Sequence, residues 1–349
     1  MNQQSETGKP LTYKEICDNA RGLMTSCKVC RVCNGEACRG VLPGVGGKGN
    51  GDNFVRNYQK LQEVKLHLDT LCEAGPIDTG MDFLGKRVDL PFFAAPLASI
   101  ENQFGPKYNT EQFSHILLEN AQAGGTVSFL PEGNPEMIGS LCGEFPGVGI
   151  PTIKPWPIEV LIERAKQYEQ AGAFAVATDL DGAGLAMVQG RGMPVAPKSV
   201  EEIRSLVEAV KIPIIIKGIM TVAGARKCVE AGVAGLVVSN HGGRVLEQAL
   251  STIEVLEHIA GAAAGRLTVL LDGAVRSGSD LFKIRALGGH GALIGRPLGV
   301  AVYGGGPEGL EVYRKKIRAE LVEAMMMTGA RRLGDICKDM VYLPQGFSV

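Results

Sequence analysis

The sequence predicts a (β/α)8 barrel, an α/β fold of the TIM-barrel type, preceded by a Cys-rich extension. From about residue 88 onward, short apolar runs alternate with amphipathic stretches of helical length, which is typical of parallel strands covered by helices. Eight such runs follow one another, the number that this barrel needs. The 349 residues, 45% hydrophobic and 21% charged, can bury the core of one large domain. An open doubly wound sheet is the rival fold, but it does not naturally supply eight consecutive units.

The apolar runs give the expected strands, and the periodic stretches between them give the helices. Apolar residues three and four apart predict helices over 157–171 and 199–210. Helix-capping Ser or Thr residues stand at Ser199, Thr221, Ser251 and Ser277. Residues 308–331 predict one long helix whose three consecutive methionines face the core. We expect the strands at 90–96, 125–130, 147–155, 174–181, 213–219, 235–243, 267–275 and 291–297.

Charge and hydropathy exclude several partners. The chain has 36 Lys and Arg against 37 Asp and Glu, so no net field would hold nucleic acid or an anionic membrane. The first residues lack the basic start and apolar run of a signal peptide. No later stretch approaches the roughly 20 apolar residues of a membrane span. We therefore expect a cytoplasmic protein with no nucleic-acid or membrane partner.

Four of the nine cysteines crowd into residues 27–38, which favours a metal or redox role over disulfide bonds. Their spacing is close to that of bacterial ferredoxins without the following proline, and thiolates suit an iron–sulfur cluster or zinc. The alternative is free thiols, some of them lining the active-site mouth. We expect residues 1–80 to pack as an extension on a barrel of residues 81–349. The predicted metal ligands are Cys27, Cys30, Cys33 and Cys38.

The carboxyl ends of the expected strands carry the polar residues that matter, because chemistry in this fold occurs at that face. Lys217 follows a run of three isoleucines, where an unpaired ammonium would be costly, so it needs an anionic partner. The next strand end delivers His241 and Arg244 to the barrel mouth within one turn.

The last two strand ends predict a phosphate site. The loops after strands seven and eight form the usual phosphate site of these barrels, so we expect a phosphorylated ligand or cofactor. The alternative is that the small residues only form tight turns and the arginines are solvated. Small residues whose amides can approach an anion, and arginines beside them, stand at Gly273, Ala274, Arg276, Gly295 and Arg296.

These segments together resemble the FMN-dependent α-hydroxy-acid dehydrogenases and oxidases, the family of glycolate oxidase and L-lactate dehydrogenase. The resemblance covers roughly residues 80–349. It implies an FMN enzyme that interconverts a small 2-hydroxy acid, such as lactate or glycolate, and its 2-oxo acid. The matching segments are 94–98, 213–219, 239–244, 272–283, 293–297 and 325–336.

The resemblance also implies catalytic roles. His241 would take a proton from the α-carbon or from the hydroxyl group of the substrate, and Arg244 would hold the substrate carboxylate. Lys217 would lie against the N1/O2 edge of the flavin. Asp181 would stabilise the imidazolium of His241. We prefer Asp181 to Asp179, because alternate residues of a strand face opposite sides and only one of the two can point inward.

Flavin contacts follow from the same resemblance. Arg276, Gly295 and Arg296 would take the phosphate, and Asp272 would support the catalytic network or the ribityl chain. The complete set of implied flavin contacts is Pro96, Leu97, Ala98, Ser128, Lys154, Lys217, Asp272, Gly273, Ala274, Arg276, Gly295 and Arg296.

The sequence departs from the family in three places. Ile153 stands where the family has a tyrosine that contacts substrate, with Lys154 beside it as a possible flavin or substrate ligand. The Cys-rich segment replaces a helix that bears an active-site tyrosine. A short loop offers Arg191 as a second carboxylate ligand.

Two other functions compete with this interpretation. One is a flavin isomerase of the type 2 isopentenyl diphosphate kind, against which the position of Arg244 argues for a carboxylate substrate. The other is a non-catalytic barrel that senses metal or redox state. A cluster near the flavin would imply an electron carrier as partner, whereas oxygen or a quinone could accept electrons without one. The resemblance further implies a homo-oligomer.

Overall fold

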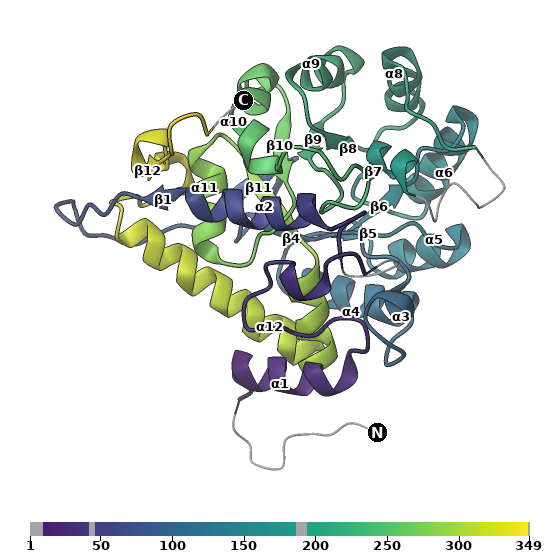
Figure 1. The fold of residues 1–349 in the computed structure, drawn as a ribbon. Helices are drawn as coiled ribbons and strands as arrows, with labels where there is room; N and C mark the ends of the chain where they lie inside the picture. The colour runs from purple at the N-terminus through teal and green to yellow at the C-terminus, as the bar shows by residue number, and fades with distance from the viewer. Residues whose placement is uncertain (1–9, 42–45, 186–193, 348–349) are drawn as a thin grey trace.

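The computed structural model describes residues 10–41, 46–185 and 194–347. Its centre is a closed barrel of eight parallel strands in the order β10-β11-β4-β5-β6-β7-β8-β9 (Figure 1). The predicted (β/α)8 barrel is confirmed. The strands are β4 (Phe92–Ala94), β5 (Ser128–Leu130), β6 (Gly149–Ile153), β7 (Val176–Asp179), β8 (Ile214–Ile219), β9 (Gly235–Val238), β10 (Thr268–Leu271) and β11 (Gly291–Ile294).

Each strand lies inside its predicted range but is shorter than predicted. The cause is clearest at β7, which ends at Asp179, where the chain turns into a 3-10 helix over Leu180–Gly184. His241, Arg244 and Asp272 therefore belong to loops at the carboxyl end of the barrel, whereas Asp179 and Lys217 lie within their strands. The register pairs Asp179 with Lys217 on β8, so two charged residues lie side by side at this end.

Helices surround the barrel, and their caps follow the sequence signals. The side chains of Ser199, Thr221 and Ser277 accept hydrogen bonds from backbone N–H groups in the first turns of their helices. The helices after the strands are α3 (Ile100–Gln103), α4 (Thr110–Ala123), α5 (Pro135–Glu144), α6 (Ile158–Gln170), α8 (Val200–Ala209), α9 (Val222–Ala231), α10 (Thr252–Ala263), α11 (Gly278–Ala286) and α12 (Arg296–Met326). No helix within these described ranges is long and apolar enough to cross a membrane.

The C-terminal helix corrects one prediction. It is α12 (Arg296–Met326), which begins before the predicted 308–331 and changes direction at Gly306 (φ 56°, ψ −140°), just before Pro307. The three methionines do not share a core face, because successive helical residues are about 100° apart. Met325 is buried, whereas Met326 is 55% exposed.

The N-terminal segment packs against the barrel through two helices. Helix α1 (Tyr13–Leu23) lies along α12, and α2 (Asp52–Glu63) lies against α10, joined to it by an ion pair between Arg56 and Glu254 (Figure 1). Short strand β1 (Lys65–Leu66) pairs with β12 (Val341–Tyr342), and β2 (Met81–Phe83) pairs with β3 (Lys86–Val88).

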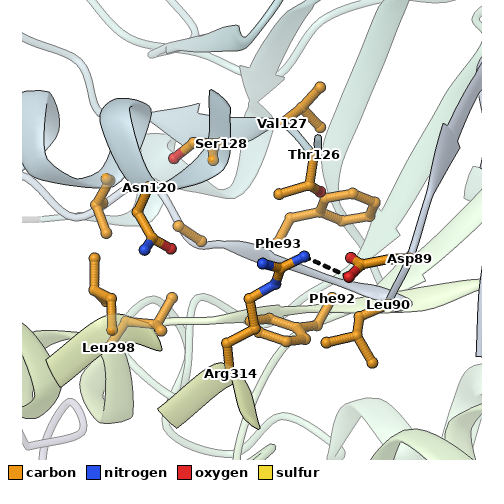
Figure 2. A pocket seen from close by; sticks show the side chains of 14 residues that line it. Asp89, Leu90, Phe92, Phe93, Asn120, Thr126, Val127, Ser128, Leu298 and Arg314 are labelled. Atoms are coloured by element: carbon orange, nitrogen blue, oxygen red, sulfur yellow. Dashed lines mark hydrogen bonds and ion pairs between the residues drawn. The ribbon is translucent and has the colours of Figure 1, made fainter. Parts of the chain in front are cut away.

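A small cavity lies between β4, α4 and α12, away from the site described below (Figure 2). Asp89 accepts hydrogen bonds from Arg314 and Arg318 beside it, which ties the chain entering β4 to α12. The cavity measures about 40 Å³, which is room for little more than water. Ser128 lines this cavity.

Helix α1 depends on a small residue of α12. A Cβ atom at Gly304 would lie 2.0 Å from the backbone oxygen of Ile16, so Gly304→Ala should push α1 away and lower the free energy of unfolding by about 1–3 kcal/mol. Denaturant unfolding and amide exchange of residues 13–23 measure this. Gly261→Ala is the matched control, because a Cβ there meets nothing within 4 Å and should be neutral or slightly stabilising. Equal effects of the two variants would contradict the packing.

Candidate active site

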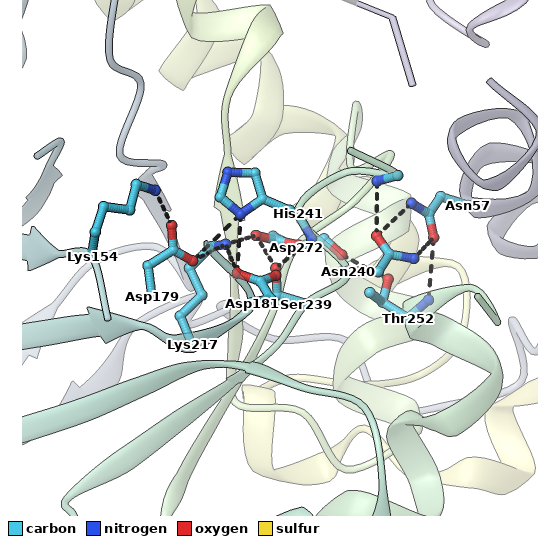
Figure 3. Close-up of polar contacts among 11 residues, drawn as sticks. Asn57, Lys154, Asp179, Asp181, Lys217, Ser239, Asn240, His241, Thr252 and Asp272 are labelled. Carbon is cyan, nitrogen blue, oxygen red and sulfur yellow. Dashed lines mark hydrogen bonds and ion pairs between the residues drawn. The ribbon is translucent and has the colours of Figure 1, made fainter. Parts of the chain in front are cut away.

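A buried ammonium surrounded by carboxylates lies at the carboxyl end of the barrel (Figure 3). Nζ of Lys217 donates to Oδ1 of Asp179 at 2.9 Å and lies 3.7 Å from Asp181 and 3.6 Å from Asp272. Lys154, from the end of β6, donates to the other oxygen of Asp179. Lys217 thus has the anionic partners that its position requires, and they come from the ends of two strands, β7 and β10.

His241 joins this network from the loop after β9. Its Nδ1 lies 3.0 Å from Oδ1 of Asp181 and 3.5 Å from Oδ1 of Asp179. The prediction that only one of these aspartates can point inward is wrong. Asp179 ends β7 and Asp181 lies in the following 3-10 helix, so the two-residue alternation of a strand does not apply between them.

Gly218 makes this arrangement possible. Its φ is +102°, and a Cβ there would lie 2.7 Å from the backbone nitrogen of Asp181. Only glycine adopts this conformation without strain and leaves the space. The loop that carries Asp181 can therefore fold down onto β8.

The network holds three carboxylates against two ammonium groups. Burial alone would raise the pKa of Asp179, but His241, Lys154 and Lys217 outweigh it and hold that pKa well below its usual range. Burial and the charge of Asp179 raise the pKa of Asp181. Burial would lower the pKa of Lys217, but the three aspartates raise it. The surplus negative charge is what an imidazolium at His241 would neutralise.

Asp179, Asp181 and His241 also lie close enough together to suit a metal ion. The ammonium of Lys217, however, already supplies the positive charge beside these same oxygens. We therefore interpret the cluster as a proton-holding group and not as a metal site.

One cavity brings most of the predicted site residues together. Ala98 and Ser128 are not among the described residues that line it: the carbonyl of Ala98 accepts from Gln103, and Ser128 faces the cavity of Figure 2. Lys154 and Asp181 reach the site through the network. The predicted residues that line the cavity are Pro96, Leu97, Lys217, His241, Arg244, Asp272, Gly273, Ala274, Arg276, Gly295 and Arg296.

Three guanidinium groups form a cationic side of this cavity. Burial, with the charges of Arg244 and Arg276, lowers the pKa of Arg296 to about 9. Burial also lowers the pKa of Arg244. Cζ of Arg296 lies 3.8 Å from the ring centroid of Phe54, a cation–π contact that supports the crowded charge. Mutual repulsion among the three groups is relieved when an anion binds between them.

The comparisons with known proteins fit this geometry. Residues 44–134 and 151–343 match the family model described as FMN-dependent dehydrogenase, and these two stretches make up most of the chain. The chain belongs to this family.

The names of several relatives describe enzymes that act on hydroxy acids. The chain is 29% identical to glycolate oxidase 1 of Oryza sativa subsp. indica over 327 residues, and the match covers 82% of this chain and 86% of the relative. It is also 29% identical to 4-hydroxymandelate oxidase of Amycolatopsis orientalis, covering 86% and 94%. Among solved structures, mandelate oxidase with 3,3-difluoro-2-hydroxy-3-phenylpropionic acid matches with a TM-score of 0.76, 26% identity and coverage of 95% and 99%. These relatives favour hydroxy-acid redox chemistry over the isomerase and the non-catalytic sensor.

The site residues of this FMN-dependent dehydrogenase fit its flavin. Asp272 Oδ1 and Arg276 Nη2 are buried and have no hydrogen-bond partner within the described part of the chain, which is costly unless a ligand supplies one. A ribityl hydroxyl suits the carboxylate, and a phosphate suits the guanidinium beside Arg296. Gly273 and Ala274 have positive φ values of 94° and 66°. These two small residues therefore also form a tight turn, which was the alternative to a phosphate site.

The loop that carries His241 is held in place by side chains that the sequence did not reveal, one of them from helix α2. The side chains of Asn57 and Asn240 exchange two hydrogen bonds of 2.9 and 2.8 Å while both are buried. Ser239 donates to Asp272 at 2.9 Å and accepts from the backbone N–H of His241. Asn240 stands within the family segment 239–244, but no spacing in the sequence links it to Asn57.

The departures from the family have clear positions. Ile153 ends β6 and is buried, so it offers no polar group to a substrate. His290 accepts from the backbone N–H of Val269 and His258 is exposed on α10, so both lie outside the network. Arg191 lies outside the described residues.

The Cys-rich segment has no disulfide among its cysteines, all of which lie in the described ranges. Nor do three of its sulfurs lie within 4.8 Å of one another there. The zinc site that the sequence allows is therefore not preformed, because four sulfurs around one zinc ion would lie about 3.8 Å apart at Zn–S distances of about 2.3 Å.

Asn57→Ala should lower the free energy of unfolding by about 1–3 kcal/mol, because it removes two hydrogen bonds to the buried side chain of Asn240 and one from the backbone N–H of Thr252. The double variant Asn57→Ala/Asn240→Ala should cost less than the sum of the two single variants. Denaturant unfolding measures all three. Strictly additive effects would contradict the pairing.

Asp181→Asn should change how stability depends on pH. The folded pKa of Asp181 is raised, so its contribution is fully present below the unfolded pKa of about 3.9 and is lost as pH rises through the folded pKa. The wild type should therefore lose stability relative to Asp181→Asn as the pH rises from about 4 through the raised folded pKa. Urea unfolding across this range measures the difference. Asp339→Asn, an exposed position, is the control, and a constant or opposite difference would contradict the assignment.

Proposed function

We propose that this protein interconverts a small 2-hydroxy acid and its 2-oxo acid, with His241 as catalytic base in one direction and acid in the other. The observation that carries this proposal is the cavity that joins His241, backed by two carboxylates, to the buried guanidinium of Arg244. A base beside an anion-binding group suits a substrate whose reacting carbon adjoins a carboxylate. The activities named for the relatives support the same substrate class.

His241 would exchange the proton through Nε2. With a proton on Nδ1 donated to Asp181 at 3.0 Å, Nε2 keeps its lone pair and can accept the proton from the substrate. The surplus negative charge of Asp179, Asp181 and Asp272 over Lys154 and Lys217 then stabilises the imidazolium. Because the network is buried, this stabilisation is stronger than it would be in water.

Arg244 would fix the substrate by its carboxylate. A guanidinium binds a carboxylate through two parallel hydrogen bonds, which sets the orientation of the α-carbon relative to His241. Gln103 supports the side chain of Arg244 from α3 through a contact of 3.4 Å. Lys154 stands in the region of the missing tyrosine, but its ammonium is bound to Asp179, so its role is to hold the network.

FMN, when bound, supplies the acceptor for the two electrons that leave the hydroxy acid. Arg276 and Arg296 would hold its phosphate, Pro96 and Leu97 would contact it, and Asp272 would meet the ribityl hydroxyls. A metal at Cys27–Cys38, an electron carrier, a homo-oligomer and a cytoplasmic location stay predictions from the sequence.

The anaerobic visible spectrum of the purified protein tests the proposal. Lactate, glycolate or mandelate should bleach the flavin band, since transfer of two electrons reduces the flavin. His241→Gln should bind flavin normally but be reduced about 100 to 10,000 times more slowly.

His258→Gln is the matched control, because His258 is exposed on α10, and it should behave as wild type. Arg244→Lys should raise the concentration of 2-hydroxy acid needed for half-maximal rate, because the bidentate contact with the substrate carboxylate is lost. A flavin band that every 2-hydroxy acid leaves intact, or an undiminished rate in His241→Gln, would refute the proposal.

A further inference from the structure

The four cysteines of the N-terminal segment line one cavity. It measures about 750 Å³ and lies between α1, the Cys-rich segment and the starts of α11 and α12. A hollow of this size is comparable to the cavities that hold bound ligands, whereas protein interiors are otherwise closely packed. The four cysteines are Cys27, Cys30, Cys33 and Cys38.

The arrangement of the sulfurs favours an occupant larger than one ion. All four thiols line the same cavity, so they are near neighbours. Yet no three of them lie within 4.8 Å of one another in the described ranges. An iron–sulfur cluster holds its cysteines farther apart than a single zinc ion does, because the iron and sulfide atoms stand between them.

The charge of the cavity favours an anionic occupant. Seven basic side chains and one acidic side chain, Asp18, line it. Four thiolates around a four-iron, four-sulfide core leave a net negative charge, which basic surroundings stabilise. Cys30 is exposed, which opens one edge of the cavity to solvent and to a partner.

The cavity adjoins the predicted flavin site. Arg276 and Arg296 line both this cavity and the one that contains His241. Nε of Arg276 donates to the carbonyl oxygen of Cys33 at 3.2 Å. The Cys-rich segment therefore contacts the same guanidinium that would hold the flavin phosphate.

We propose that Cys27, Cys30, Cys33 and Cys38 bind a four-iron, four-sulfide cluster that carries electrons between the flavin and an external one-electron carrier. Oxidation of the hydroxy acid to the oxo acid releases two electrons and two protons. The flavin takes both electrons, and the cluster passes them one at a time to two oxidised carrier molecules. The electron-transfer part rests on the proposed function, whereas the metal content does not.

Metal and sulfide analysis of protein purified without oxygen tests the site. We expect about four iron and about four acid-labile sulfide per chain. Cys33→Ser and Cys30→Ser should lose most of the iron. Cys17→Ser, which removes another thiol from the same cavity, should keep it. Flavin content and circular dichroism show whether each variant folds, and Cys30→Ser is exposed enough to spare the packing.

About one zinc per chain without sulfide would overturn the proposal. So would a protein that contains no iron and takes up none from iron and sulfide. Iron kept by Cys30→Ser and Cys33→Ser would also contradict the assigned ligands.

An anaerobic reductive titration tests the electron route. The wild type should take up about three electrons per chain, two on the flavin and one on the cluster, and Cys33→Ser about two. A 2-hydroxy acid should then bleach the flavin and produce the paramagnetic signal of the reduced cluster. Bleaching without that signal would overturn the route. Iron and sulfide in a protein that no hydroxy acid reduces would refute the proposed function and the route while leaving the cluster in place.

Discussion

The attraction between the Lys217 ammonium and the aspartates around it organises the rest of the site. A buried charge is tolerated only when opposite charges and hydrogen bonds surround it. Lys217 meets that requirement with Asp179 and Asp181 from the end of β7 and with Asp272 from the end of β10. Closure of the barrel is what brings these ends together. Asp179 and Asp181 also hold His241, so one electrostatic cluster supports the fold and would support the proposed proton chemistry.

The N-terminal segment belongs to the active site as much as the barrel does. Helix α2 supplies Asn57 to the His241 loop and Phe54 to the face of Arg296. A Cβ at Gly243 would lie 2.5 Å from the backbone nitrogen of Phe54, so the loop and the helix are in direct contact. Loops that carry catalytic groups work best when a rigid element fixes them. Here that element is a helix from outside the barrel.

The cavity contains groups of both charges. Asp179 and Asp272 line it with His241, and the guanidinium groups of Arg244, Arg276 and Arg296 line it as well, close enough to lower the pKa of Arg296. An anionic ligand is drawn to the arginines, while a proton is held by the carboxylates. The cluster proposed at Cys33 and its neighbours would share the arginines, which gives the phosphate and the thiolates a common source of positive charge.

The sequence by itself determined the barrel and its eight strands, and it predicted most of the residues that line the cavity at the barrel's carboxyl end, because hydrophobic periodicity and residues at strand ends are local signals. It did not determine strand ends, so it placed Asp179 and Asp181 on opposite faces. It could not pair Asn57 with Asn240, could not give the spacing of the cysteines, and did not reveal the small cavity that Ser128 lines. Those facts depend on which distant segments touch, and only tertiary packing decides that.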